Sequence, residues 1–358
     1  MSAAASLTPS TWAHQGGAVP RPLSNTDPAL RRCWHPVARS GDVAEQPHGV
    51  MLLGEPWVLF RSGGAVRAFA DRCPHRHCPL ALGHCDEGVL QCAYHGWRFD
   101  GDGRCMQIPA LGEGATLPPS AHLTPAAAVA EAHGMVFIAP EPPIAPLGSI
   151  PEADDATFQV GELPTLRARG SAGLLADNFL DIAHFPFVHA GTFGTDEAAE
   201  VDPYAVARDD WMFTVAYEHP FAHREDPGVA AGLRPLVQTR RLTYRLSAPF
   251  HLRLRIDFVD SGGSNGIGFF IQPETEETCR LFTTLWRDEL DGDEARMAGA
   301  VAFELAVLRE DLRIQEAYHE LVLPLDPTAE VHTRADRATL ELRRVLADLV
   351  AAVEGGTG

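Results

Sequence analysis

The sequence is poor in positive charge. Its 358 residues include 29 lysines and arginines against 48 aspartates and glutamates, which gives a formal net charge of -19 at pH 7. Nucleic-acid-binding proteins usually turn a basic surface toward the phosphates, so this balance argues against a nucleic-acid partner. An acidic surface would suit a basic redox partner, although most acidic surfaces are simply solvated.

Long apolar runs are also missing. The stretch AAAVAEAHGMVFIAP at 126–140 is interrupted by Glu131 and His133, and no other window suggests a membrane span. The N-terminus lacks the basic region and apolar run of a secretory signal, and Arg31 and Arg32 lack the hydrophobic stretch of a twin-arginine signal. We therefore expect a cytoplasmic protein with no membrane anchor and a mobile tail over residues 1–30.

Cysteine is sparse and unevenly placed. Most of the seven cysteines fall in one segment, whereas a secreted disulfide framework would spread them over a smaller chain. The chain also has no G-x-G-x-x-G between a strand and a helix, and no plant-type ferredoxin cysteine pattern. A redox role would therefore require a separate protein that supplies the electrons.

Turn and proline signals divide the chain into two parts. The runs PWVLF and VRAFA flank Ser62, Gly63 and Gly64, which predicts a hairpin within a region of short strands. The segment APEPPIAPLGSIPEADD at 139–155 is rich in proline, which is excluded from central strands and helix interiors. We place the domain boundary there, with one domain over residues 31–145 and a second over 146–358.

The second domain mixes strands and helices. HLRLRIDF at 251–258 alternates apolar and polar residues, and strands are expected throughout 236–288. The segment 174–191 is expected to be helical with a kink or an end at Pro186. A long helix should run from about 293 to just before Pro324, followed by an amphipathic helix over 334–353. The pattern predicts a small β domain followed by an α+β domain with an antiparallel sheet.

Four cysteines and four histidines fall in the segment 73–100, CPHRHCPLALGHCDEGVLQCAYHGWRFD. Cys73 and His75 form C-x-H, Cys92 and His95 form C-x-x-H, and sixteen residues lie between the two pairs. Two such loops could hold a two-iron cluster, with both thiolates on one iron and both imidazoles on the other. A structural zinc site is the alternative, but zinc modules usually pair Cys with Cys and His with His. The remaining candidates are expected to be packing or surface residues: His77, Cys78, His84, Cys85 and Cys105.

These two loops, with the trailing GWRF, resemble the cluster-binding loops of Rieske proteins, particularly the Rieske non-haem iron oxygenases. The resemblance implies that Cys73 and Cys92 bind one iron of a [2Fe-2S] cluster and that His75 and His95 bind the other. It covers most of the chain and is nearest to members with only a large subunit, such as the O-demethylases of vanillate and dicamba and related N-demethylases. It implies an α+β fold with an N-terminal all-β Rieske domain and a C-terminal helix-grip-like catalytic domain with an antiparallel sheet and long helices.

A second metal site is suggested by NFLDIAHFPFVHAG, in which His184 and His189 could aim at one point if the helix bends. By itself this motif is a weak signal, because two histidines on an apolar segment are usually ordinary buried or surface residues. The resemblance implies that both bind a mononuclear Fe(II). Two histidines and one carboxylate leave positions open for O2 and substrate.

The third ligand is expected on the long helix. Asp311 is the only charge on one helical stripe, where a carboxylate is costly unless it is paired or bound to metal. Glu310 is the fallback ligand, and the alternative is a rotated stripe with Asp311 in solvent. The stripe consists of Phe303, Val307, Asp311, Ile314, Tyr318 and Leu321.

The resemblance also gives a role to Asp181, which by itself could be a surface charge. In the family this carboxylate links an iron-ligating histidine to a cluster-ligating histidine across a subunit boundary, which implies a head-to-tail ring, usually a homotrimer. Asn178 is a weaker candidate for a residue that lines the iron site.

The predicted function is that of a terminal oxygenase. A separate reductase, with or without a ferredoxin, would pass electrons from NAD(P)H, and O2 would be the co-substrate. The expected reaction is hydroxylation or oxidative demethylation of a small aromatic or alicyclic molecule. Ring cis-dihydroxylation is the alternative within the class, and an electron-transfer Rieske protein without oxygenase activity is the alternative outside it. Pocket residues are expected from the sheet around 210–288 and from HAGTFG, and the apolar character there argues against a highly charged ligand.

Overall fold

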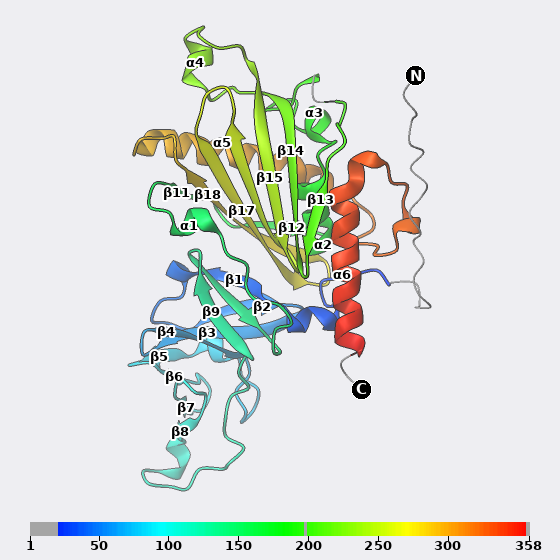
Figure 1. Ribbon diagram of the computed structural model, residues 1–358. Helices are drawn as coiled ribbons and strands as arrows, with labels where there is room; N and C mark the ends of the chain where they lie inside the picture. The colour runs from blue at the N-terminus through cyan, green and yellow to red at the C-terminus, as the bar shows by residue number, and fades with distance from the viewer. Residues whose placement is uncertain (1–20, 197–198, 356–358) are drawn as a thin grey trace.

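The computed structural model describes residues 21–196 and 199–355 (Figure 1). The first twenty residues of the predicted tail lie outside the described residues. The prediction is wrong for residues 21–30, which are packed. Leu23 forms a β-bridge with Leu323, and Leu30 is fully buried in a 3-10 helix, Pro28–Arg32, that contacts the last helix. The apolar side chains of this segment pack against the C-terminal part of the chain, so it cannot behave as a free tail.

The N-terminal part consists of three small antiparallel sheets. The first has the order β1 (His35–Arg39), β10 (Met135–Ala139), β9 (Ala128–Ala132). The second is β2 (His48–Leu52), β3 (Glu55–Ser62), β4 (Ala65–Ala70). The third is β5 (His84–Asp86), β6 (Val89–Gln91), β7 (Arg98–Phe99), β8 (Cys105–Gln107). The predicted hairpin is confirmed: Ser62 pairs with Ala65, and Gly63 and Gly64 both take positive φ, as a tight hairpin turn requires.

The C-terminal part is built on one eight-stranded antiparallel sheet. Its order is β11 (Gln159–Glu162), β18 (Thr278–Arg287), β17 (Ser264–Thr275), β16 (His251–Phe258), β15 (Val237–Ser247), β14 (Met212–Ala222), β13 (Val206–Asp209), with β12 (Leu166–Arg169) also paired to β18. The expected alternation in β16 is confirmed, because Leu252, Leu254, Ile256 and Phe258 are all buried. This alternation gives the sheet a continuous apolar face.

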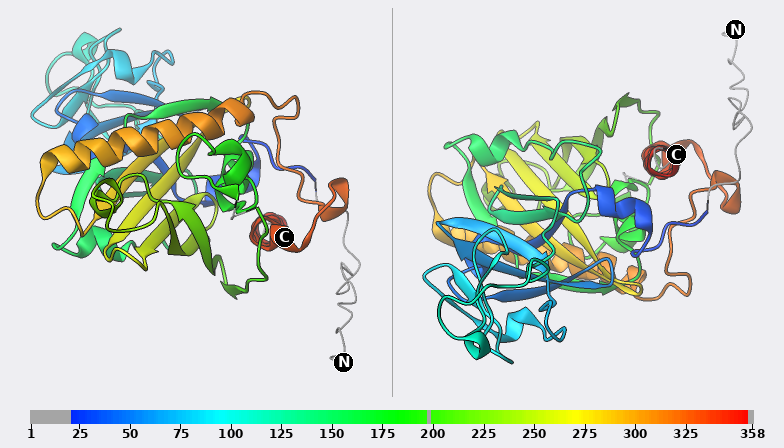
Figure 2. Two further views of the ribbon diagram at one scale, coloured as in Figure 1. Left: turned by 90° about the horizontal axis from the view of Figure 1, so that it is seen from above. Right: turned by 90° about the horizontal axis from the view of Figure 1, so that it is seen from below.

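Helices cover that face. In Figure 2, α5 (Glu294–Gln315) lies along the sheet, and the segment that holds α2 (Ala172–Leu180) and α3 (Phe185–Val188) lies beside its C-terminal end. The last helix, α6 (Arg337–Gly355), contacts α2, β13 and β14. Within the described ranges, no helix combines the length and the apolar character needed to cross a bilayer.

The long helix is shorter than predicted. α5 ends at Gln315 rather than just before Pro324, and its last turn is closed when the Glu316 N–H donates to the Leu312 carbonyl. The chain then extends so that Leu323 can pair with Leu23. The predicted apolar stripe therefore faces the protein interior as far as Asp311. Beyond Asp311 the prediction is wrong, because Ile314 and Tyr318 are exposed.

The two parts are joined along the sheet. The backbone N–H of Leu53 donates to the Pro273 carbonyl at 2.9 Å, and buried Arg39 donates to the carbonyls of Leu163 and Thr283, each at 2.9 Å. This attachment leaves β5 to β8 at the opposite end of the molecule from α3 (Figure 1).

Candidate active site

The segment between α2 and α3 places two histidines around a single turn. α2 ends with Asp181 as its C-cap residue, and α3 begins at Phe185 with Pro186 in its first turn. The predicted kinked helix is therefore two separate helices, because proline fits a first turn and not an interior. His184 precedes α3 and His189 follows it, so the two imidazoles can turn toward the same point.

Three side chains converge beside this turn. The Nε2 atoms of His184 and His189 lie 3.0 Å apart, and Asp311 Oδ1 lies 3.4 Å and 3.2 Å from them, respectively. One ligand atom of each residue falls within 4.8 Å of the others. The structure thus brings the predicted set together, with Asp311 supplied by α5.

The electrostatics of this cluster favour a cation. Burial lowers the pKa of His184, but the carboxylates of Asp181 and Asp311 outweigh it and raise the pKa to about 9. Asp311 Oδ1 is also buried without a hydrogen bond. Two imidazoles and one carboxylate on one side of a point are the donor set that ferrous iron takes in oxygenases.

Neighbouring groups hold the imidazoles in place. Glu310 Oε2 accepts from His189 Nδ1 at 2.9 Å and from the Thr192 hydroxyl at 2.9 Å. A proton on Nδ1 leaves Nε2 of His189 free to bind a metal. Glu310, the fallback ligand, therefore contacts the far side of the ring and lies outside the converging set.

Asp181 lies on the other side of the cluster. Its Oδ2 is 3.4 Å from His184 Nδ1, and its Oδ1 accepts from the Ala183 N–H at 2.8 Å. Its side chain is 32% exposed, so the carboxylate contacts a buried imidazole and also reaches the surface. Asn178, one turn earlier on α2, is not among the residues that line the adjoining cavity.

The other four candidate ligands meet in the N-terminal part. Cys73 and Cys92 are buried in the same small core, whereas His75 and His95 are exposed with ring centroids 4.5 Å apart. Trp97 stacks on His75 with a centroid separation of 4.8 Å. Two sulfurs on the inner side and two imidazoles on the outer side are the donors that a Rieske cluster takes.

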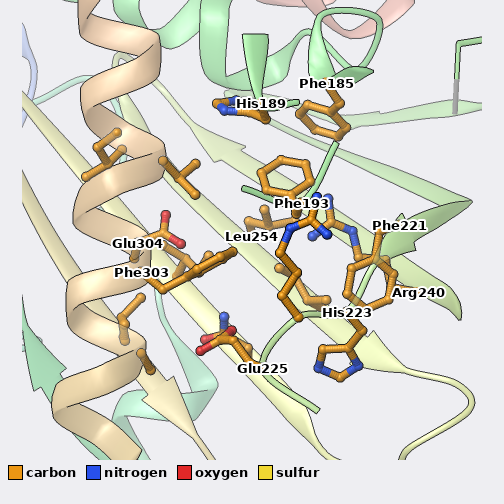
Figure 3. Close-up of a pocket in the computed structure, with 18 of the residues that line it drawn as sticks. Phe185, His189, Phe193, Phe221, His223, Glu225, Arg240, Leu254, Phe303 and Glu304 are labelled. Carbon is orange, nitrogen blue, oxygen red and sulfur yellow. The ribbon is translucent and has the colours of Figure 1, made fainter. Parts of the chain in front are cut away.

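A cavity opens directly from the His184, His189 and Asp311 cluster (Figure 3). It encloses about 840 Å³ of space between atoms, including its open mouth. The sheet, α5 and the segment after α3 all contribute to its walls. Its aromatic lining consists of Phe179, Phe185, Phe193, Phe221, Tyr244, Phe258, Phe269 and Phe303.

Comparison with known proteins agrees with this geometry. Residues 33–122 match the Rieske [2Fe-2S] domain family, and residues 168–352 match the vanillate O-demethylase oxygenase C-terminal domain family. The chain is a Rieske non-haem iron oxygenase. Membership implies a Rieske cluster and a mononuclear iron, and the two donor sets described above fit these groups.

Several relatives match this Rieske oxygenase over long stretches. The methylxanthine N3-demethylase NdmB of Pseudomonas putida is 28% identical over 353 residues, which cover 94% of each chain. The oxygenase component of dicamba O-demethylase from Stenotrophomonas maltophilia is 33% identical over 189 residues, 50% of this chain and 53% of that protein. The structure of Pseudomonas putida CBB5 NdmA superimposes with a TM-score of 0.79 at 25% identity, over 92% of this chain and 94% of that one.

Cys78 of this Rieske oxygenase packs against the small core that holds Cys73 and Cys92, as predicted for a packing residue. Its thiol donates to the Pro79 carbonyl at 3.6 Å. The chain reverses at His77, which has a φ of 56°, and the Cys73 N–H donates to the Cys78 carbonyl at 2.9 Å. That Cys78 is not a ligand of the cluster stays a prediction.

The cavity is less apolar than its sequence suggested, and the prediction against a highly charged ligand stays a prediction. The sheet and HAGTFG do contribute to it as predicted, but α5 adds a wall, and Arg240 and Glu304 both face the interior. Arg240 lies on the buried face of β15 while Arg241 is exposed. The alternation of Gln238, Arg240 and Leu242 could have indicated that Arg240 faces inward. The adjacent Arg241 has the same charge, so the sequence did not show which of the two arginines is buried.

Proposed function

We propose that this chain is the terminal component of a system that uses O2 and reductase-supplied electrons to hydroxylate or oxidatively demethylate a small aromatic or alicyclic substrate. The observation that carries the proposal is the cluster of His184, His189 and Asp311 at the inner end of an apolar cavity. Relatives named as N-demethylases and as an O-demethylase support removal of a methyl group by hydroxylation.

The proposed ligands of the mononuclear iron are the Nε2 atoms of His184 and His189 and the Asp311 carboxylate. Ferrous iron bound there would supply the activation of O2. Glu310 keeps the proton of His189 on Nδ1, and Phe185 and Phe193 pack beside that ring and limit the access of water. The apolar walls would hold the methyl group of a substrate against this end of the cavity.

The proposed cluster ligands are Cys73 and Cys92 for one iron and His75 and His95 for the other. Within one chain, the N-terminal sheet that adjoins them lies at the opposite end of the molecule from α3 (Figure 1). We therefore propose that electrons cross between subunits of a homotrimer, with partly exposed Asp181 as the link between the two sites. A separate reductase, with or without a ferredoxin, would deliver them from NAD(P)H.

The proposal can be tested by iron analysis and a reconstituted assay. Protein purified without oxygen should contain three irons per chain and show the EPR signal of a reduced Rieske cluster. With a reductase and NADH, aromatic methyl ethers and N-methyl compounds should be screened for formaldehyde release coupled to O2 uptake. Two irons per chain would instead indicate an electron-transfer protein, and a diol without formaldehyde would indicate ring dihydroxylation.

A further inference from the structure

We propose that Arg240 binds the carboxylate of an aromatic substrate and thereby makes this oxygenase select anionic over neutral compounds. The inference rests on the proposed function, because it treats the cavity beside the iron ligands as the substrate site. The evidence for it is the unpaired positive charge of Arg240 in the cavity wall.

Arg240 is a buried cation without a counter-ion. Its residue is 6% exposed, and within the part of the chain that the structure describes it forms no ion pair. Its one protein hydrogen bond runs from Nε to His219 Nε2 at 2.9 Å, so the terminal nitrogens remain available. Burial lowers the pKa of Arg240 to about 10, which still leaves it charged at neutral pH. An unpaired buried charge is costly, and a bound anion would remove that cost.

Aromatic rings hold the guanidinium in place. It lies 4.3 Å from the ring centroid of Phe193, 4.9 Å from that of Phe221 and 5.7 Å from that of Phe185 (Figure 3). Such contacts attract a cation and fix its plane, but they do not neutralise it. A guanidinium held in one plane is suited to bind both oxygens of a carboxylate.

The position of Arg240 sets the size of the substrate. Phe193 stacks on the ring of His189 with centroids 4.7 Å apart, so the guanidinium lies one aromatic ring away from a predicted iron ligand. A single-ring acid bound to Arg240 would therefore direct its far edge toward the iron site. A methoxy or methylamino group on that edge would be the one attacked.

Other charges in the cavity do not cancel that of Arg240. Glu304 faces it from α5, but burial and then the negative charge of Asp311 raise the pKa of Glu304 to about 8, so it is mainly neutral at pH 7. Arg287 is paired with Glu225 at 3.8 Å and with Glu289. Of the two buried arginines that line the cavity, Arg240 is therefore the one without a charged partner among the described residues, which favours a singly charged anion.

The histidines of the same wall are neutral. Burial and the adjacent Arg240 lower the pKa of His219 to about 2, which leaves its Nε2 as an acceptor for Arg240. Burial also lowers the pKa of His223. His219 is therefore a positioning residue that orients the guanidinium and adds no charge.

The test is a binding measurement that needs no turnover. The anaerobic holoenzyme would be titrated calorimetrically with 2-, 3- and 4-methoxybenzoate and with the corresponding neutral methoxybenzamides. We expect the enzyme to prefer at least one acid over its amide. Arg240→Met should weaken binding of that acid by roughly 10- to 100-fold, the value of a charge-assisted hydrogen bond, and change amide binding by less than about threefold. Arg240→Lys should retain part of the preference.

Arg241→Met is the matched control, because Arg241 is the next residue of β15 but is exposed and does not line the cavity. It should leave the acid-to-amide ratio unchanged. The inference would be overturned if wild type bound no acid, if acids and amides bound equally well, or if Arg240→Met and Arg240→Lys lost both compounds alike. If neutral methyl ethers still released formaldehyde in those cases, the proposed function would stand without the inference.

Discussion

The two candidate metal sites differ in how they meet the solvent. His75 and His95 are exposed at one end of the molecule, whereas His189 is 1% exposed and is covered by α5 and by phenylalanine rings. A site that receives electrons from another protein must lie near the surface. A site that handles O2 and an apolar substrate must exclude water, since water competes for open positions and weakens directed electrostatic interactions.

The largest expected effects come from removing one site at a time. His184→Ala should abolish turnover and lower the iron content from three to two per chain while the visible spectrum of the cluster remains. Cys92→Ala should also abolish turnover, but it should remove the cluster and leave one iron. Iron analysis, visible spectra and O2 uptake would check both.

His122→Ala is the control for this pair, because His122 is exposed and lies outside both donor sets. It should retain full activity. The separation of the two sites would be refuted if His184→Ala bleached the cluster or if Cys92→Ala lost all iron.

A smaller effect is expected where the two sites are proposed to communicate. Asp181→Asn should leave three irons per chain and a reducible cluster, yet slow the reoxidation of the cluster by about 10- to 100-fold, because a neutral amide no longer polarises the adjacent imidazole. Stopped-flow spectroscopy of the reduced protein mixed with O2 and substrate would measure this rate. Asp209→Asn, an exposed change on β13, is the control. An unchanged reoxidation rate in Asp181→Asn would exclude Asp181 from the electron path.

The effect of burial on the pKa of a carboxyl group can be tested at Glu304. The pKa of this carboxyl is raised to about 8 in the folded chain, against an ordinary value of 4.5. The folded state therefore holds more protons between these values, and its stability should fall as pH rises through that window. Glu304→Gln should remove this dependence, so the melting temperature of the variant should exceed that of wild type by a few degrees at pH 9 and match it at or below about pH 4. Equal pH profiles by calorimetry would contradict the shift.

The smallest effect is expected at the cluster loops. Cys78→Ala removes a polar thiol beside Cys92, and polar groups around cluster sulfurs stabilise the reduced form. The midpoint potential should therefore fall, by about 20–40 mV for a weak polar interaction. Protein-film voltammetry would measure the change, with Cys105→Ala as a control away from Cys92. A potential unchanged by Cys78→Ala would show that this thiol does not tune the cluster.

The two sites also differ in how far the sequence predicted them. The cluster loops could be predicted because the two ligands of each pair are close in sequence, so their spacing alone relates them to one centre. The spacing of His184 and His189 was a weak signal by itself, and the resemblance to the family assigned them. Asp311 could be singled out because burial of a lone carboxylate is costly. The length of α5 could not be predicted from the sequence, because the end of this helix depends on the pairing of Leu323 with a distant segment.

The cavity was the least predictable part. Its polar groups come from a strand and from a helix far apart in sequence, and their directions depend on the phase of each element. The adjacent Arg240 and Arg241 have the same charge, and only packing against the sheet decides which one faces inward. Similarly, the local motif at 73–78 could not reveal the turn at His77, because that turn requires an unusual positive φ.

The placement of the cluster loops and the iron ligands at opposite ends of one chain has a genetic consequence. On the proposed assembly, the working unit is the contact between two subunits, and neither subunit is complete alone. An allele that damages only the cluster and an allele that damages only the iron ligands would therefore complement each other when expressed together. In randomly mixed rings, about a quarter of the contacts would join an intact cluster to an intact iron site.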